Sequence, residues 1–83
     1  MKIFALYSSE WEEIKGMYYM LDTAFEEAKK LTLEVCPETE DFDISETMTC
    51  ENNAEWKVNV ICRLEGEVKF YPTGYSIYCF EVK

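Results

Sequence analysis

Carboxylates are concentrated in one part of this chain. Of its 17 Asp and Glu residues, eight lie between Lys30 and Lys57, where no Lys or Arg occurs. They are Glu34, Glu38, Glu40, Asp41, Asp43, Glu46, Glu51 and Glu55. The segment therefore carries −8 of the formal net charge of −9, since the other nine acids and eight bases nearly balance. Charge this concentrated produces a local electric field that acts on charged partners. The partner it favours is a basic protein surface, a basic peptide or a cation.

Part of this segment also has a regular spacing. Alternate residues of a strand lie on one face about 6.6–6.8 Å apart, and Asp41 and Asp43 are spaced in this way. That distance is similar to the phosphate spacing along one nucleic-acid strand. A more specific form of the basic-partner hypothesis is therefore that this segment mimics nucleic acid. The row of negative charges does not continue, because the next alternate positions are the neutral residues Ser45, Thr47 and Thr49. The alternative is a solvated face that only keeps the protein in solution.

Calcium binding and acid–base catalysis are weaker interpretations of the same carboxylates. Asp41-x-Asp43-x-Ser45 begins like an EF-hand loop, but Glu46 stands where glycine is required and Asn52 where a bidentate Glu is required. Sequence spacing alone does not identify a catalytic carboxylate pair. The sequence therefore predicts no catalytic residue, no metal site and no cofactor.

The chain has no histidine and four cysteines, Cys36, Cys50, Cys62 and Cys79. Without histidine the usual general base near pH 7 and the Ser-His-Asp and Cys-His arrangements are missing. No C-x-x-C spacing occurs, which argues against zinc and thioredoxin-like chemistry. We expect a protein that is not an enzyme, with buried thiols in the strands and the most exposed thiol at Cys36.

Aromatic residues are the second group suited to binding. Trp11 lies among acidic residues in a polar stretch, outside any periodic element. We expect it to fold back over the core; the alternative is an exposed anchor for a partner, because Trp and Tyr dominate interface energetics. Tyr71, Tyr75 and Tyr78 are expected to pack in the core and at its rim, or else to line a groove for a partner.

The N-terminal half predicts two strands and a helix that position these groups. Lys2–Tyr7 is apolar on both faces, which indicates a central strand. Ile14–Met20 predicts a second strand, in which Gly16 marks a bulge or a close approach. Thr23–Glu34 predicts a helix that ends before Pro37.

Three features are expected of that helix. A capping box of Thr23 and Glu26 begins it, and Glu26 then faces Lys30 at i,i+4. One apolar stripe packs on the sheet. Its residues are Ala24, Phe25, Ala28, Leu31 and Val35.

The C-terminal half predicts a meander of strands. Asp41–Cys50 places Phe42, Ile44, Met48 and Cys50 on one face, with a bulge or break at Glu46, and a turn follows at 51–53. Residues 56–64 alternate cleanly, Glu65-Gly66 indicates a hairpin, and a return strand around 68–70 follows. Residues 72–74 (Pro-Thr-Gly) predict a further turn before a last strand over 75–82. The expected fold is α+β, β-β-α-β-β-β-β, a single antiparallel sheet of five to six strands with one helix packed on one face.

Length and composition predict one domain over residues 1–83. A chain of this length buries roughly two thirds of its unfolded surface, and 48% hydrophobic and 16% aromatic residues argue against disorder. No stretch approaches the roughly 20 apolar residues of a membrane span, and the apolar start is too short for a signal peptide. We therefore expect a cytoplasmic protein with reduced thiols.

The N-terminal third is similar to a group of known proteins. The residues concerned are KIFALYSSEW at 2–11, IKGMY at 14–18 and TAFEEA at 23–28. Over about the first 33 residues the chain resembles small uncharacterised proteins of phages and mobile bacterial elements, where a strand, a short loop and an I-x-G-x-Y strand lead into such a helix. The resemblance implies a viral or prophage origin, hence a host-cell cytoplasm. By analogy with small acidic phage proteins it implies an inhibitor of a host or defence enzyme.

The leading hypothesis is a small acidic, non-enzymatic interaction module. It binds a basic protein surface, such as that of a nucleic-acid-binding protein, without binding nucleic acid or a membrane itself. The predicted binding residues are five for electrostatic steering and one apolar anchor: Glu38, Glu40, Asp41, Asp43, Glu46 and Trp11. The alternatives are a protein that sequesters a small molecule or ion and a self-assembling structural protein, since open sheet edges allow homodimers.

Overall fold

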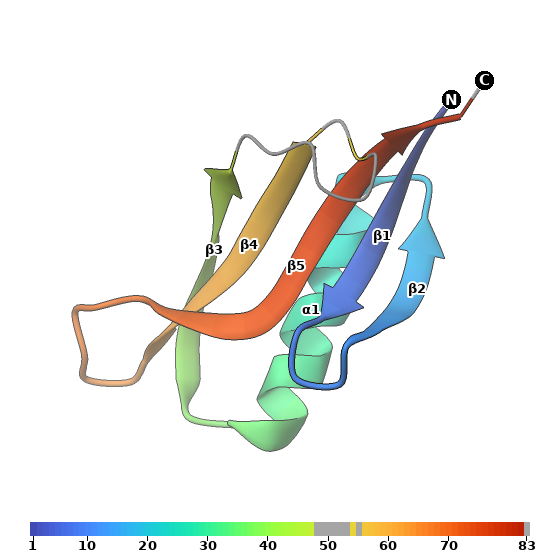
Figure 1. The fold of residues 1–83 in the computed structure, drawn as a ribbon. Coiled ribbons are helices and arrows are strands. Elements are labelled where there is room, and N and C mark those ends of the chain that lie inside the picture. The colour runs from blue at the N-terminus through green and yellow to red at the C-terminus, as the bar shows by residue number, and fades with distance from the viewer. Residues whose placement is uncertain (48–53, 55, 83) are drawn as a thin grey trace.

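The computed structural model describes residues 1–47, 54 and 56–82. They form one antiparallel sheet of five strands and one helix, in the order β-β-α-β-β-β (Figure 1). The elements are β1 (Lys2–Ser8), β2 (Glu13–Tyr18), α1 (Leu21–Val35), β3 (Thr39–Thr47), β4 (Trp56–Leu64) and β5 (Tyr71–Glu81). The predicted α+β class with a single sheet is confirmed, with one strand fewer than the predicted element order.

The strands lie in the order β2-β1-β5-β4-β3, so that the two ends of the chain come together in the middle of the sheet. The predicted central position of the first strand is confirmed, since β1 pairs with β2 on one side and with β5 on the other. Both termini lie at the same end of this pair (Figure 1), where the Val82 backbone N–H donates to the Met1 carbonyl at 2.7 Å. The sheet edges are therefore β2 and β3.

The two faces of the sheet have different coverings. Helix α1 packs on one face, where Leu6, Ile77 and Val58 form a row across the three central strands. Ala24 and Ala28 of the helix are fully buried against this face, and their small side chains let the helix lie close to the sheet. No helix of the described residues lies over the other face (Figure 1), which is called the open face below.

Helix α1 differs from the predicted helix at both ends. Its N-cap is Met20, without a side-chain cap bond, so the predicted capping box is wrong. Glu26 pairs with Lys29 at 2.7 Å rather than with Lys30, because the i,i+3 lysine lies on the same side toward β3. The apolar stripe ends at Thr32, which is buried, whereas Val35, the last residue of α1, is 84% exposed. As predicted, the helix ends before Pro37, with Cys36 as its C-cap.

Irregularities were predicted at Gly16 in β2 and at Glu46 in β3. Each strand has a register shift, but the one in β3 lies elsewhere. In β2, Leu6 pairs with Gly16 and Tyr7 with Ile14, which leaves Lys15 as the extra residue beside the predicted glycine. In β3 the register is regular through Glu46, which pairs with Val58, so a bulge at Glu46 is wrong. The register shift of β3 lies instead between Thr39 and Asp41. The predicted positions of Met48 and Cys50 and the turn at 51–53 lie outside the described residues.

The C-terminal part has one long bent strand where two strands and a turn were predicted. Residues 67–70 form no strand, and Val68 is almost fully exposed. The residues predicted as a turn lie inside β5, where Ile61 pairs with Pro72 and Asn59 with Ser76. Three residues of β5 thus oppose one residue of β4, and the strand bends there (Figure 1).

Side-chain hydrogen bonds complete this bulge. The Thr73 hydroxyl donates to the Val60 carbonyl at 2.7 Å and accepts from the Tyr75 backbone N–H at 3.1 Å. Gly74 has φ of 88°, a left-handed conformation that glycine adopts without strain. The Pro-Thr-Gly sequence therefore changes the direction of the chain, as predicted, but without ending the strand. Among the described residues no helix is long and apolar enough to cross a membrane.

Candidate functional site

The predicted acidic residues lie along edge strand β3 and just before it. All five side chains are exposed: Glu38, Glu40, Asp41, Asp43 and Glu46. Asp41 and Asp43 share the open face, because the residues that alternate with them, Phe42 and Ile44, pack against the helix-side core. Glu46 pairs with Val58 and so belongs to the helix side of the edge. We call these five residues the β3 carboxylates.

One arginine of the neighbouring strand neutralises part of this charge. Arg63 is the cross-strand partner of Asp41, and its guanidinium makes ion pairs with Asp41 and, at 3.5 Å, with Glu40. The hydrogen bond that Arg63 donates to the Asp41 carboxylate is the largest cause that raises the pKa of Arg63, followed by the field of Glu40. Asp43 instead accepts a hydrogen bond from the backbone N–H of Ile44 at 2.8 Å. Asp43 and Glu46 therefore keep their full charge toward solvent.

Trp11 is exposed, and it does not lie beside the β3 carboxylates. It belongs to the turn between β1 and β2 and is 67% exposed, so the expectation that it folds over the core is wrong. Its backbone N–H donates to Ser8 Oγ at 3.3 Å, and Lys15 Nζ lies 5.7 Å from the ring centroid. The strands that this turn joins, β1 and β2, lie three and four strand spacings from β3, which at about 4.8 Å per spacing is roughly 14–19 Å.

The tyrosines predicted together lie on opposite faces. Tyr75 packs against the helix-side core, and Tyr71 lies half-exposed on the same side. Tyr78 lies on the open face, where it makes an edge contact with Tyr7 at 5.9 Å between ring centroids and a tilted contact with Phe80 at 6.4 Å. Tyr75 and Tyr78 are three residues apart in β5, so the alternation of side chains along a strand places them on opposite faces.

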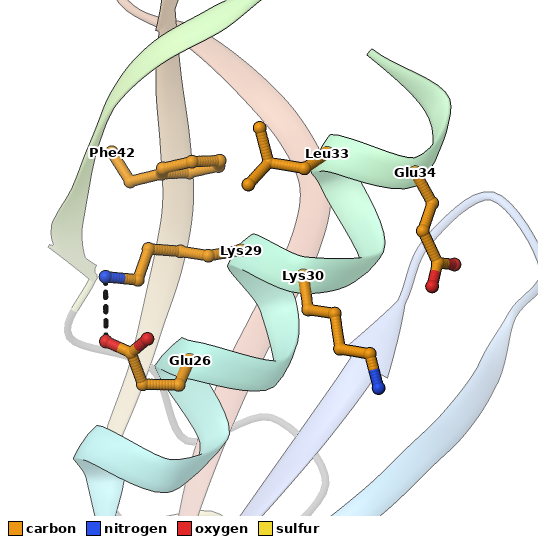
Figure 2. A pocket seen from close by; sticks show the side chains of 6 residues that line it. All are labelled: Glu26, Lys29, Lys30, Leu33, Glu34 and Phe42. Atoms are coloured by element: carbon orange, nitrogen blue, oxygen red, sulfur yellow. Dashed lines mark ion pairs between the residues drawn. The ribbon is translucent and has the colours of Figure 1, made fainter. Parts of the chain in front are cut away.

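A shallow cleft of about 560 Å³ separates α1 from β3. Figure 2 shows Phe42 and Leu33 pointing toward each other across it, with the Glu26–Lys29 ion pair beside them. Lys29 Nζ also lies 4.9 Å from the centroid of the Phe25 ring. Since the lining side chains carry two positive and two negative charges, this cleft offers no net charge to a ligand.

A smaller cleft of about 260 Å³ lies where the end of α1 meets the bent part of β5. Leu31, Tyr71 and Pro72 are among its apolar walls, and both Cys36 and Cys62 line it. Burial, and secondarily the neighbouring Cys36, raises the pKa of the Cys62 thiol. The expected order of exposure is confirmed for the described cysteines, since Cys36 is half-buried while Cys62 and Cys79 are buried. A buried, protonated thiol is a weak nucleophile.

The described residues contain no group of three or more His, Cys, Asp or Glu side chains placed to hold a metal ion. Of the β3 carboxylates, Asp41 and Asp43 share the open face, Asp41 is paired with Arg63, and Glu46 lies on the helix side. Their arrangement suits attraction of a broad positive surface rather than coordination of one ion.

Comparison with known proteins gives no family assignment: no protein-family model, no curated protein and no solved structure matches this chain.

Proposed function

We propose that this protein is a non-enzymatic interaction module that presents edge strand β3 to a basic surface of a partner protein. The observation that supports this most directly is the row of five exposed β3 carboxylates against a single arginine on the neighbouring strand. Charge on an interface rim mainly accelerates association and sets its salt dependence. The partner's positive surface is the kind that nucleic-acid-binding proteins carry, and a host or defence protein inhibited by a phage product is one such case.

The geometry favours general electrostatic attraction over close mimicry of nucleic acid. Mimicry needs several rows of negative charge, and the open face of β3 carries only Asp41 and Asp43 before Ser45. Asp41 is also paired with Arg63. Glu38, Asp43 and Glu46 make no ion pair in the described chain and are therefore the steering residues whose charge no neighbouring cation offsets.

The test is affinity capture from bacterial lysate with tagged protein at low and at moderate salt. The informative variant is Asp43→Asn combined with Glu46→Gln, because neither residue makes an ion pair in the described structure, whereas changing Asp41 would release the charge of Arg63. Glu65→Gln combined with Glu67→Gln is the matched control, since it removes the same charge from the exposed loop between β4 and β5.

We expect one stoichiometric partner whose association is several-fold slower with the β3 variant at low salt and nearly unchanged with the control. The difference should shrink at moderate salt, where the Debye length falls to about 8 Å. Equal capture by wild type and both variants would contradict the electrostatic role of β3. Absence of any specific partner would contradict the interaction module as a whole.

A further inference from the structure

The open face contains a hollow of about 640 Å³ at the end of the sheet away from β3. It exists because Ala5 lies between the larger Ile3 and Tyr7 in the open-face row of β1. Ala5 and its cross-strand partner Tyr78 form the floor and are only 1% and 6% exposed, although no helix covers them. Tyr7, Phe80 and Ile14 form the walls.

Two carboxylates lie at the mouth of this hollow. Glu12 belongs to the turn between β1 and β2, and Glu13 is the first residue of β2. Both are exposed and line the hollow. Glu13 is paired with Lys15 at 2.6 Å, and this hydrogen bond is the largest cause that raises the pKa of Lys15. Within the described chain, the Glu12 carboxylate makes no hydrogen bond or ion pair. Its charge is therefore free to meet a ligand.

The aromatic floor already binds a cation from within the chain. Lys57 of β4 places its ammonium 5.4 Å from the centroid of the Tyr78 ring, on the side toward β4. The edge contact between Tyr7 and Tyr78 and the tilted contact between Tyr78 and Phe80 hold the three rings in fixed orientations. Aromatic rings with this kind of arrangement attract cations through their negative faces.

We propose that the hollow receives an arginine side chain of the basic partner. Its methylene stem would pack on Ala5 and Ile14, its guanidinium plane against the aromatic walls, and its charge beside Glu12. Arginine fits better than lysine because its planar group stacks on rings and is less strongly hydrated.

This inference depends on the proposed function, because a basic partner supplies the arginine. It adds a second contact, on the far side of the open face from β3.

The test is titration of ¹⁵N-labelled protein with N-acetyl-arginine amide at low salt, followed by amide chemical shifts. The lysine amide and the citrulline amide, a neutral isostere of arginine, are the comparison ligands. We expect shifts centred on Tyr7, Tyr78 and Phe80, with affinity in the order arginine, lysine, citrulline. Glu12→Gln should weaken arginine binding about two- to five-fold, as for an exposed ion pair.

Glu10→Gln is the matched control, because Glu10 belongs to the same turn and carries the same charge but lines the cleft beside α1 instead. It should leave arginine binding unchanged. Equal binding of arginine and citrulline, or equal loss with Glu10→Gln and Glu12→Gln, would overturn the inference. Shifts confined to β3 would also overturn it while supporting the proposed function. Binding in the hollow without any captured partner would support the hollow and contradict the proposed function.

Discussion

The division of the sheet into a covered and an open face can be tested with two isoleucines. Ile77 of β5 is fully buried on the helix side, between the equally buried Leu6 and Val58 of the neighbouring strands. Ile61 of β4 is half-buried on the open face, opposite Asp43. Replacing each by alanine removes the same atoms from the two faces, so the difference in cost measures how well each face is covered.

The expected costs follow from burial. Ile77→Ala leaves a cavity that neither strand neighbour nor helix can fill, so we expect a loss of about 3–4 kcal/mol within the range of about 2–5 known for such changes. A domain of this length is stable by only about 4–12 kcal/mol. Ile61→Ala creates no closed cavity and should cost about 1 kcal/mol. The corresponding decreases in Tm are about 12 °C or more and about 4–8 °C.

Guanidinium unfolding followed by tryptophan fluorescence measures both losses. Trp56 packs on Phe4 with 5.9 Å between ring centroids, so its emission reports the core, whereas Trp11 is exposed. A Trp11→Phe background leaves Trp56 as the only tryptophan of the chain. Equal losses for Ile77→Ala and Ile61→Ala would refute the reasoning, because they would mean that the open face is covered as completely as the helix face.

Two further predictions concern stability. Burial raises the pKa of the Cys62 thiol above its ordinary 9.0 and that of the Tyr18 phenol above 10.0, the latter with a smaller effect of Glu27. Both are neutral when protonated, so their contribution is full below the unfolded pKa values and is lost as the pH rises through the folded ones. Tm should therefore fall in alkaline buffers, and less steeply above pH 10.0 for Tyr18→Phe; an unchanged slope would contradict this. Gly74→Ala should lower the free energy of unfolding by about 1–2 kcal/mol, because alanine is strained at a positive φ. Gly74→Asn should lower it less, since asparagine tolerates that region. Equal losses for the two variants would argue against backbone strain as the cause.

The periodicity of the sequence determined most of the secondary structure. Strand β4 has the predicted bounds, because clean alternation over residues 56–64 matches only a strand with one buried face. The helix ends where Pro37 requires, since the residue before a proline avoids helical backbone angles. The spacing of Asp41 and Asp43 indicated one face of a strand, and both lie on the open face of β3.

The sequence also determined where the chain changes direction, but not how. Pro72, Thr73 and Gly74 are typical turn residues, yet they form a bulge inside β5 because Val60 supplies a carbonyl for the Thr73 hydroxyl. That partner is 13 residues away, so no local pattern could reveal it. Likewise Val35 fits the helical stripe, yet it is exposed at the last position of α1.

What only the tertiary structure decided is which side chains meet. Net charge and its confinement between Lys30 and Lys57 are properties of composition, whereas the neutralisation of Asp41 by Arg63 depends on the register of β3 against β4. The hollow at Ala5 depends in the same way on β1 lying between β2 and β5, which brings residues 75 positions apart in the sequence, Ala5 and Phe80, to one site. Periodicity specifies a face for each residue, but pairing between distant strands specifies its neighbours, and binding sites are made of neighbours.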